Sequence, residues 1–234
     1  MTKPRILASS IGAAGLVFAV PATLSDGAAR VLCAWVLIAC LWVSVAYLTN
    51  RPGLLGKRRG RLSAWRSLPI APYLLAYAIA SWIRRARRRY ASWDAVAPGL
   101  YVGARVPAAE LPAGLELVVD LTAEIPEAAD VRSLPGYRSL PVLDGSCPPD
   151  EERFLELLGE MSEATGGVYL HCISGRGRAP SAAATVLLAR GVASDAASAL
   201  ELVCKGRSVA RPTEIDVRFV ERIAARLRRS ENAL

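Results

Sequence analysis

The sequence contains a single histidine, His171, and its five cysteines, at positions 33, 40, 147, 172 and 204, show no paired spacing. Neither a disulfide scaffold nor a zinc ribbon is therefore supported. Aromatic residues make up only 6% of the 234 residues, whereas apolar residues make up 53%. The mean hydropathy of +0.29 excludes a disordered chain and fits poorly with a purely soluble protein.

Acidic residues are almost absent from residues 1–93, which hold 14 Lys and Arg but a single acid, Asp26. Residues 94–234 hold 15 Lys and Arg against 20 Asp and Glu, so the formal net charge of +8 hides two parts of opposite sign. The excess of basic residues lies beside apolar segments. This pattern argues against a uniformly basic nucleic-acid-binding protein, and we expect no nucleic-acid partner.

Two uncharged runs, residues 6–25 and 31–50, each contain 20 residues. A helix rises 1.5 Å per residue, so each run reaches about 30 Å, the thickness of the hydrocarbon core of a bilayer. We expect residues 1–50 to form two transmembrane helices, joined as a hairpin by the link Asp26–Arg30. A cleaved signal peptide over residues 1–22 is the alternative for the first run, although it lacks a good cleavage site.

Basic residues flank this hairpin on both sides, and six of them lie between positions 51 and 66. The positive-inside rule then places both ends of the hairpin in the cytoplasm. We therefore expect an integral protein of the cell or inner membrane, with the lipid bilayer as a partner and the domain that follows in the cytoplasm.

Residues 51–93 are expected to form a basic juxtamembrane segment, with 11 Lys and Arg and no acid. They include a third apolar run at 67–83, where a helix that begins at Pro72 is too short to span a bilayer. Three apolar side chains share one face of this helix, which favours an interfacial helix in contact with lipid: Leu75, Ile79 and Trp82. A helix packed against the hairpin is the alternative. The basic residues favour binding of this segment to an anionic membrane leaflet; the alternative is that they only set the orientation of the hairpin in the membrane.

Residues 94–234 have the composition of a globular α/β domain. Strand-like runs occupy residues 100–102, 115–121, 137–142 and 167–171. Helical patterns occupy residues 150–163, 178–190, 194–205 and 214–229. Strands followed by helices predict a central, mostly parallel sheet flanked by helices on both faces, with ligands bound beyond the carboxyl ends of the strands.

The residues that carry chemistry follow the last of these strands. Cys172 ends an apolar strand, Gly175 and Gly177 lie in the loop, and Arg178 opens an Ala-rich helix. The glycines allow successive backbone N–H groups to point inward as an anion-binding nest, and the start of the helix adds further donors. The arginine can donate to two phosphate oxygens at once, and the same field favours the thiolate form of the cysteine.

These features predict nucleophilic attack by sulfur on a phosphate monoester, with the phosphoryl group bound by the backbone of residues 172–178 and by the arginine. No metal is needed, because Arg178 and the nest neutralise the charge of the phosphate. The phosphate-binding residues are predicted to be Ile173, Ser174, Gly175, Arg176, Gly177 and Arg178.

His171 directly precedes the cysteine, so on a strand it points to the opposite face of the sheet. This placement argues against a Cys/His protease dyad. We expect the imidazole to support the loop through hydrogen bonds rather than to take part in the chemistry.

His171, Cys172, five further residues and Arg178 resemble the signature of the Cys-based protein tyrosine phosphatases, and they are most similar to the compact dual-specificity branch. The resemblance covers about residues 96–229 and includes LYVGA at 100–104 and VVDLT at 118–122. It implies a dual-specificity phosphatase-like catalytic domain over residues 94–234 that works through a phosphocysteine intermediate and needs no cofactor. Arg207 and Arg211 resemble an arginine-bearing turn late in the family domain, or are surface charges.

The resemblance also implies a general acid on a loop before the cysteine, which protonates the leaving oxygen and later activates water. Asp144, in the sequence LPVLDGS at 140–146, matches this position. Asp150 is the competitor, although it reads better as a helix N-cap. Asp120, at the end of a buried strand, is expected to hold loop backbone.

Two positions depart from the family pattern. The family usually has Ser or Thr directly after the arginine, where its hydroxyl bonds the cysteine sulfur and eases breakdown of the phosphocysteine, but this chain has Ala179. Ser174 or Ser181 is a possible substitute. Arg176 adds a cation to the loop, which is similar to the loops of phosphoinositide-directed relatives; a solvent-facing arginine is the alternative reading.

The sequence thus predicts a membrane-anchored, Cys-dependent phosphatase acting on phosphoproteins at Tyr, Ser or Thr. Cys172, Arg178 and Asp144 are the expected catalytic residues, with His171 and Ser181 in supporting roles. Two alternatives stay open. One is a phosphatase of phosphoinositides or other phospholipid headgroups, and the other is a catalytically weak module that binds phosphate at the membrane.

Overall fold

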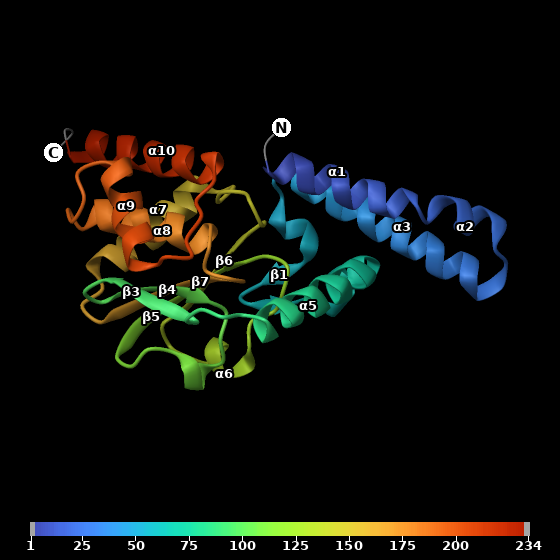
Figure 1. Ribbon diagram of the computed structural model, residues 1–234, viewed down its shortest axis with the longest axis horizontal. Helices are drawn as coiled ribbons and strands as arrows, with labels where there is room; N and C mark the ends of the chain where they lie inside the picture. The colour runs from blue at the N-terminus through green and yellow to red at the C-terminus, as the bar shows by residue number, and fades with distance from the viewer. Residues whose placement is uncertain (1–2, 232–234) are drawn as a thin grey trace. The chain divides into compact units, whose positions relative to one another are not determined.

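The computed structural model describes residues 3–231 and contains two compact units (Figure 1). The first unit comprises residues 1–88 together with 123–126, and the second comprises residues 89–122 and 127–234.

The first unit begins with three apolar helices, α1 (Lys3–Leu16), α2 (Ala19–Leu24) and α3 (Gly27–Leu48). By length and composition, residues 4–24 and 27–48 form two helices that could cross a membrane. Pro21 has no N–H to donate to the preceding turn, which fits the break between α1 and α2. The link between the two long segments is shorter than expected. Only Ser25 and Asp26 separate α2 from α3, since residues 27–30 of the expected link already belong to α3. Arg30, in the first turn of α3, donates to the Asp26 carboxylate at 2.9 Å.

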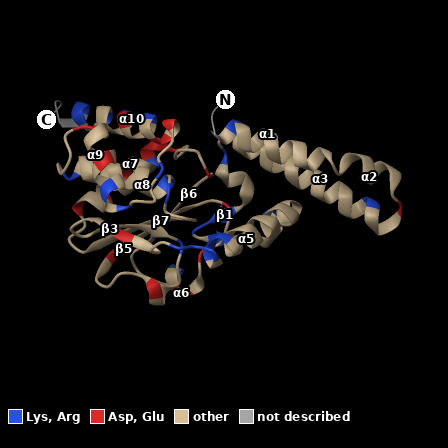
Figure 2. Cartoon of the chain, viewed as in Figure 1, with Lys and Arg blue, Asp and Glu red and all other residues tan. Residues whose placement is uncertain are grey.

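Small residues let α1 and α3 pack closely against each other. A Cβ at Gly15 would lie 2.5 Å from the Cβ of Cys40, and the Ser44 hydroxyl donates to the Ala8 carbonyl at 2.9 Å. Figure 2 shows that the charged residues of these helices lie near their ends. The length, composition and close packing of the two helices are compatible with a membrane hairpin.

The basic segment after α3 is more structured than its composition suggests. It forms the 3-10 helix η1 (Pro52–Leu55), a hairpin of β1 (Lys57–Arg58) and β2 (Arg61–Leu62), α4 (Ala64–Ser67), the 3-10 helix η2 (Leu68–Ile70) and α5 (Ala71–Ala86). The hairpin turn has positive φ at both Arg59 (47°) and Gly60 (76°), the geometry of a two-residue type I′ turn. Two tryptophans of α3 donate hydrogen bonds to this segment. The Trp35 indole N–H donates to the carbonyls of Leu68 and Pro69, and the Trp42 indole N–H donates to the Leu54 carbonyl.

The helix expected to begin at Pro72 is α5, which begins one residue earlier and carries this proline in its first turn. It contacts α3, as the packing alternative expects, yet none of its residues is buried. Leu75, Ile79 and Trp82 are 63%, 51% and 69% exposed. Within the first unit, the described residues therefore leave exposed the apolar face that the sequence assigns to lipid.

The second unit is built on a five-stranded sheet in the order β3-β4-β7-β5-β6. The strands are β3 (Trp93–Ala97), β4 (Leu100–Ala104), β5 (Leu115–Thr122), β6 (Tyr137–Val142) and β7 (Gly167–Cys172). The neighbours β4, β7, β5 and β6 are parallel, and only the edge strand β3 is antiparallel, to β4. This confirms the predicted mostly parallel sheet.

Four long helices cover one face of this sheet (Figure 1). They are α7 (Glu151–Glu163), α8 (Arg178–Ala189), α9 (Ala196–Gly206) and α10 (Glu214–Glu231). The core beneath them contains Phe154, Phe219 and Leu170. The other face is covered by the 3-10 helix η3 (Ala108–Glu110), the one-turn helix α6 (Ala129–Arg132) and loops, around Tyr169 and Val131. Helices thus flank the sheet as expected, but the long ones lie on one face.

The edge strand β3 and helix α6 were not predicted. The alternation of apolar and polar residues in β3 is weak, because it has alanines where larger apolar residues would mark a strand. Its pairing with β4 follows from the Pro98-Gly99 turn that joins the two strands. Helix α6 has only four residues, too few for a periodic pattern to emerge.

Candidate active site

Strand β7, the loop 172–178 and helix α8 form a continuous unit at the carboxyl edge of the sheet. All residues of β7 are buried, which explains its uninterrupted apolar run. Cys172 is only 3% exposed, and its sulfur accepts a hydrogen bond from the Gly175 N–H at 3.3 Å. Gly175 has a φ of +63°, and a Cβ there would lie 2.5 Å from the carbonyl carbon of Gly103. Only glycine lets the chain turn back here toward the sulfur.

Arg207 holds the outer side of this loop. Its side chain is fully buried and donates to the carbonyls of Gly175 (2.7 Å) and Ser174 (3.3 Å). It also pairs with Asp94 at 2.6 Å. The N–H of Arg211 donates to the Arg176 carbonyl at 2.7 Å.

These contacts fix which way the loop amides face. In a trans peptide the C=O of one residue and the N–H of the next point in opposite directions. Because the carbonyls of residues 174, 175 and 176 are bonded from outside, the N–H groups of residues 175, 176 and 177 point the other way. The Gly175 N–H, which reaches the Cys172 sulfur, agrees with this orientation. The loop is therefore a nest of inward amides, suited to a tetrahedral oxyanion.

Arg178, at the start of α8, is held by the ends of two neighbouring strands. Its Nη1 donates to the Val142 carbonyl at 2.5 Å and to the Leu121 carbonyl at 3.4 Å. Its Nη2 lies 3.9 Å from an Asp144 carboxylate oxygen. The side chain of Asp144 is 42% exposed, whereas that of Arg178 is 4% exposed. The structure therefore brings together the predicted phosphate ligand and the predicted acid, with the acid on the solvent side.

The hydroxyl of Ser181 is directed away from the role suggested for it. It bonds the Gly177 carbonyl and an Asp216 carboxylate oxygen, both at 2.8 Å. The other Asp216 oxygen accepts from the N–H and the hydroxyl of Thr213 at 2.7 Å each. Ser181 thus connects the end of the loop to the start of α10. The side chain of Ala179, at the position where the family usually has a hydroxyl, is fully buried.

The remaining predicted residues have separate positions. Asp150 caps α7, where its side chain accepts from the Arg153 N–H at 3.0 Å, which confirms the N-cap reading. Asp120 accepts from the Thr122 N–H at 2.9 Å, so it has a structural role as expected, but the backbone that it holds is the end of β5 rather than a loop. The Arg176 side chain is exposed, which is compatible with both the headgroup reading and the solvent-facing reading.

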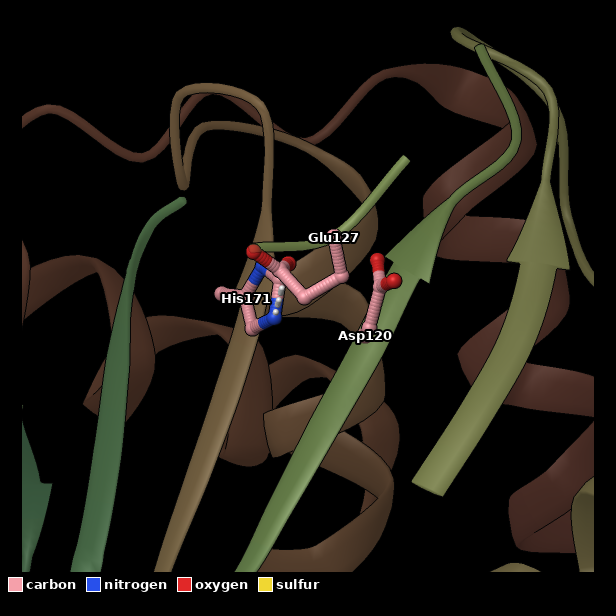
Figure 3. A group of neighbouring side chains, drawn as sticks. All are labelled: Asp120, Glu127 and His171. Atoms are coloured by element: carbon pink, nitrogen blue, oxygen red, sulfur yellow. Dashed lines mark ion pairs between the residues drawn. The ribbon is translucent and has the colours of Figure 1, made fainter. Parts of the chain in front are cut away.

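The side chain of His171 points to the face of the sheet opposite to that of Cys172, where it lies within a buried polar cluster (Figure 3). Its Nε2 is 3.2 Å from one carboxylate oxygen of Glu127, and the other oxygen is 3.0 Å from Nε of Arg105. Its ring stacks on that of Tyr169, with centroids 5.7 Å apart. The sequence indicates the supporting role of His171 but not its partner. Glu127 was missed because it is 44 residues away in the chain and shares no local pattern with the histidine.

Among the described residues, Asp120, Glu127 and His171 bring potential metal-ligand atoms within 4.8 Å of one another. Each carboxylate already accepts protein donors. Asp120 accepts from the Tyr137 hydroxyl at 2.8 Å, and burial, followed by the negative charge of Asp120, raises the pKa of this hydroxyl, which stays protonated. Glu127 pairs with a guanidinium. The donor set therefore fits a hydrogen-bonded ion cluster better than a cation site.

A cysteine at the end of a buried strand, a nest of inward amides and an arginine at the start of the next helix give this loop a geometry suited to a tetrahedral oxyanion beside a thiol. The family model described as "Swiss Army Knife protein, DSP-PTPase phosphatase domain" matches residues 104–224. Because the match spans more than half of the chain, the protein belongs to this family, and its second unit is a phosphatase domain of the tyrosine and dual-specificity class.

Solved structures share this fold. Human DUSP28 is 21% identical, the match covers 59% of this chain and 97% of DUSP28, and the TM-score is 0.50. PTPMT1, solved in complex with PI(5)P, is 14% identical, with 60% and 99% of the two chains covered and a TM-score of 0.50. A search of curated proteins gave no match.

Proposed function

We propose that this protein is a membrane-anchored phosphatase that hydrolyses phosphate monoesters of phosphoproteins, at Tyr, Ser or Thr, through a phosphocysteine intermediate. The observation that carries the proposal is the convergence of the Cys172 sulfur and the inward amides of residues 175–177 in the loop that ends at Arg178. The amide N–H groups would donate to the non-bridging oxygens of a phosphoryl group and leave its phosphorus facing the sulfur.

In the first step the thiolate of Cys172 attacks phosphorus, the S–P bond forms and the bond from phosphorus to the leaving oxygen breaks. Asp144 gives its proton to that oxygen, so the product leaves as an alcohol or phenol. The exposed position of Asp144, next to Arg178, supports this assignment, whereas Asp150 is engaged as a helix cap.

In the second step the Asp144 carboxylate takes a proton from water, the resulting hydroxide oxygen attacks phosphorus and the S–P bond breaks. Inorganic phosphate leaves and the thiolate returns. In the family this step is normally assisted by a hydroxyl on the residue after the arginine. Ala179 has no hydroxyl, and the hydroxyl of Ser181 bonds Asp216 instead. We therefore expect breakdown of the phosphocysteine to be the slower step.

The proposed organisation is a transmembrane hairpin (residues 1–50), a basic juxtamembrane segment with an interfacial helix (51–93) and a catalytic domain in the cytoplasm (94–234). The support comes from the two apolar helices, from the exposed apolar face of α5 and from the arginines at its end. Anchoring would hold the site near substrates at the surface of the cell or inner membrane.

Phosphoinositides and other phospholipid headgroups are the second substrate class. Arg176 favours them, because it is an exposed cation in the phosphate-binding loop and adds charge that suits a multiply phosphorylated headgroup. Ala179 favours the third possibility, a weak phosphate-binding module. The test is phosphate release from an aryl phosphate, a phosphopeptide panel and phosphoinositide vesicles by the full chain in lipid nanodiscs.

We expect turnover on the aryl phosphate and the phosphopeptides, and none with Cys172→Ser, which should still bind vanadate. Turnover on vesicles alone would establish the lipid class instead. A burst of one phosphate per protein with no further release would establish the binding module. Activity retained by Cys172→Ser would exclude the mechanism.

A further inference from the structure

The first unit contains a cleft of about 320 Å³ that none of the residues of the proposed chemistry lines. One wall is Trp42 of α3, and the rest is formed by the segment that follows this helix. The lining residues of that segment are Gly53, Leu54, Trp65, Arg66 and Pro69. A volume of this size is within the range of sites that bind small ligands. The lining combines two indoles and other apolar groups with one guanidinium.

The backbone around this cleft is held in place, so the cleft is preformed. The Trp42 indole N–H donates to the Leu54 carbonyl at 3.1 Å, which fixes η1 against α3. Gly56 has a φ of +80°, and a Cβ there would lie 2.8 Å from the Cβ of Arg66, so glycine lets the end of η1 approach α4 closely. The Ser63 N–H, at the start of α4, donates to the Gly56 carbonyl at 3.1 Å.

The side chains of the cleft offer apolar surface and positive charge together. Trp65 is 84% exposed and Trp42 is 43% exposed. Arg66 is exposed as well, and residues 51–93 contain no acid that could neutralise it. Three further exposed arginines belong to the hairpin of β1 and β2: Arg58, Arg59 and Arg61. A ligand that matches this lining carries a negative charge next to an apolar chain.

The position of the cleft along α3 matches the boundary between headgroups and acyl chains. Trp42 lies six residues before Leu48, the last residue of α3, which corresponds to about 9 Å along the helix axis. In the proposed topology this is the cytoplasmic end of the helix. Indoles are enriched at this depth of a bilayer, and an arginine here can extend its guanidinium to the lipid phosphates while its stem stays in apolar surroundings.

We propose that this cleft binds one anionic phospholipid of the cytoplasmic leaflet. The Arg66 guanidinium bonds two oxygens of the phosphodiester, and an acyl chain lies along Trp42, Leu54 and Pro69. Charge complementarity favours a lipid with a net negative charge over a zwitterionic one, whose cationic headgroup the arginines repel. The inference rests on the proposed function for the membrane anchor alone, and it does not depend on phosphatase activity.

The test uses the full chain in a neutral detergent at about 0.15 M salt. It is titrated with phosphatidylglycerol or with phosphatidylcholine of the same acyl chains, and native mass spectrometry counts the lipids retained per chain. We expect one phosphatidylglycerol per chain, bound about tenfold more tightly than phosphatidylcholine. Inorganic phosphate and vanadate, which are ligands for the proposed active site, should not displace it.

Two variants change the cleft in different ways. Arg66→Gln should weaken the binding of phosphatidylglycerol about tenfold, because a charge-assisted hydrogen bond is lost, and Arg66→Lys should restore part of the affinity. Gly53→Leu should also weaken binding, because a Cβ at this position meets no other atom within 4 Å and the added side chain can extend into the cleft.

The matched control is Arg61→Gln, because Arg61 is exposed in the same segment but does not line the cleft. It should leave the affinity within about twofold of the wild type, since salt screens a charge that makes no direct contact. All three positions are exposed, so the variants should keep the thermal unfolding temperature of the wild type.

Equal losses in Arg66→Gln and Arg61→Gln would show a diffuse attraction to anionic lipid and would overturn the site. Equal binding of the two lipids, unchanged binding by Gly53→Leu, or displacement by vanadate or phosphate would do the same. A dimer without retained lipid would assign the cleft to a second copy of the chain. A chain that stays soluble without detergent would disprove the anchor as well, whereas a chain that binds the lipid but hydrolyses no phosphate ester would disprove the proposed activity alone.

Discussion

Arg207 offers the sharpest test of how the loop at residues 172–178, which we propose binds phosphate, is held in place. Its guanidinium donates to the carbonyls of Ser174, Gly175 and Ser92 and pairs with Asp94. The change Arg207→Met keeps most of the apolar stem but removes the guanidinium donor from the Ser174 and Gly175 carbonyls and the partner from Asp94. The Ser92 carbonyl still accepts from the Ala104 N–H. Breaking a fully buried ion pair costs about 3–5 kcal/mol. The Asp94 side chain is 34% exposed, so water replaces part of the lost interaction, and we expect a smaller loss from a domain that is typically stable by about 5–15 kcal/mol.

The loss should also reach the chemistry, because the outward carbonyls no longer keep the amides of residues 175 and 176 facing inward. Loss of a single oxyanion donor lowers turnover by about 10²–10³-fold, so we expect kcat/KM on an aryl phosphate to fall at least about 10²-fold. The assay is steady-state turnover below the unfolding transition, with the free energy of unfolding measured in parallel by denaturant titration.

The matched control is Arg218→Met, since Arg218 is an exposed partner of Glu214 on α10. It should change the free energy of unfolding by less than about 0.5 kcal/mol and leave turnover unchanged. If Arg207→Met folds and keeps kcat/KM within about threefold of the wild type, the orientation of the loop does not depend on this residue, and the reasoning above is wrong.

Two further predictions concern carboxylates. Asp144→Ala should slow hydrolysis about 10²–10³-fold for esters with poor leaving groups and less for good ones, whereas Asp150→Ala should lower stability by about 1 kcal/mol with little effect on turnover; the reverse pattern in leaving-group assays would move the acid to Asp150. The Gly166 N–H, at 2.6 Å, and then Thr165 lower the pKa of Glu116, so this carboxylate stabilises the fold above its unfolded-state pKa and loses this contribution as the pH falls through the folded-state pKa. The unfolding temperature of Glu116→Gln should therefore be lower than that of the wild type at pH 7 and equal to it in strong acid. A difference in unfolding temperature that persists in acid would contradict this.

The structure of the loop at residues 172–178, between β7 and α8, was predictable from the sequence because its information is local. A buried strand, two glycines and an arginine at the start of a helix are consecutive, and each carries a backbone or charge requirement that can be read directly. The same holds for Asp150, whose cap depends on residues within one turn. The expected strands and long helices agree with the structure within a few residues for the same reason.

What could not be predicted depends on residues far apart in the chain. Arg207 reaches the loop from 32 positions beyond Gly175, and only the fold shows that its carbonyl partners orient the amides. Glu127, in the segment between β5 and α6, lies 3.2 Å from His171 at the end of β7, a contact between residues 44 positions apart. The direction of the Ser181 hydroxyl was equally hidden, since Asp216 competes for it from another helix.

The central claim is that the sulfur of Cys172 receives the phosphoryl group. It is tested most directly by rapid acid quench of the Asp144→Ala variant during turnover of an aryl phosphate, followed by mass spectrometry of the peptide that contains residue 172. The account predicts one phosphate per chain, attached to Cys172 and absent from Cys172→Ser. Continued phosphate release with no phosphate on this cysteine at any quench time would contradict it.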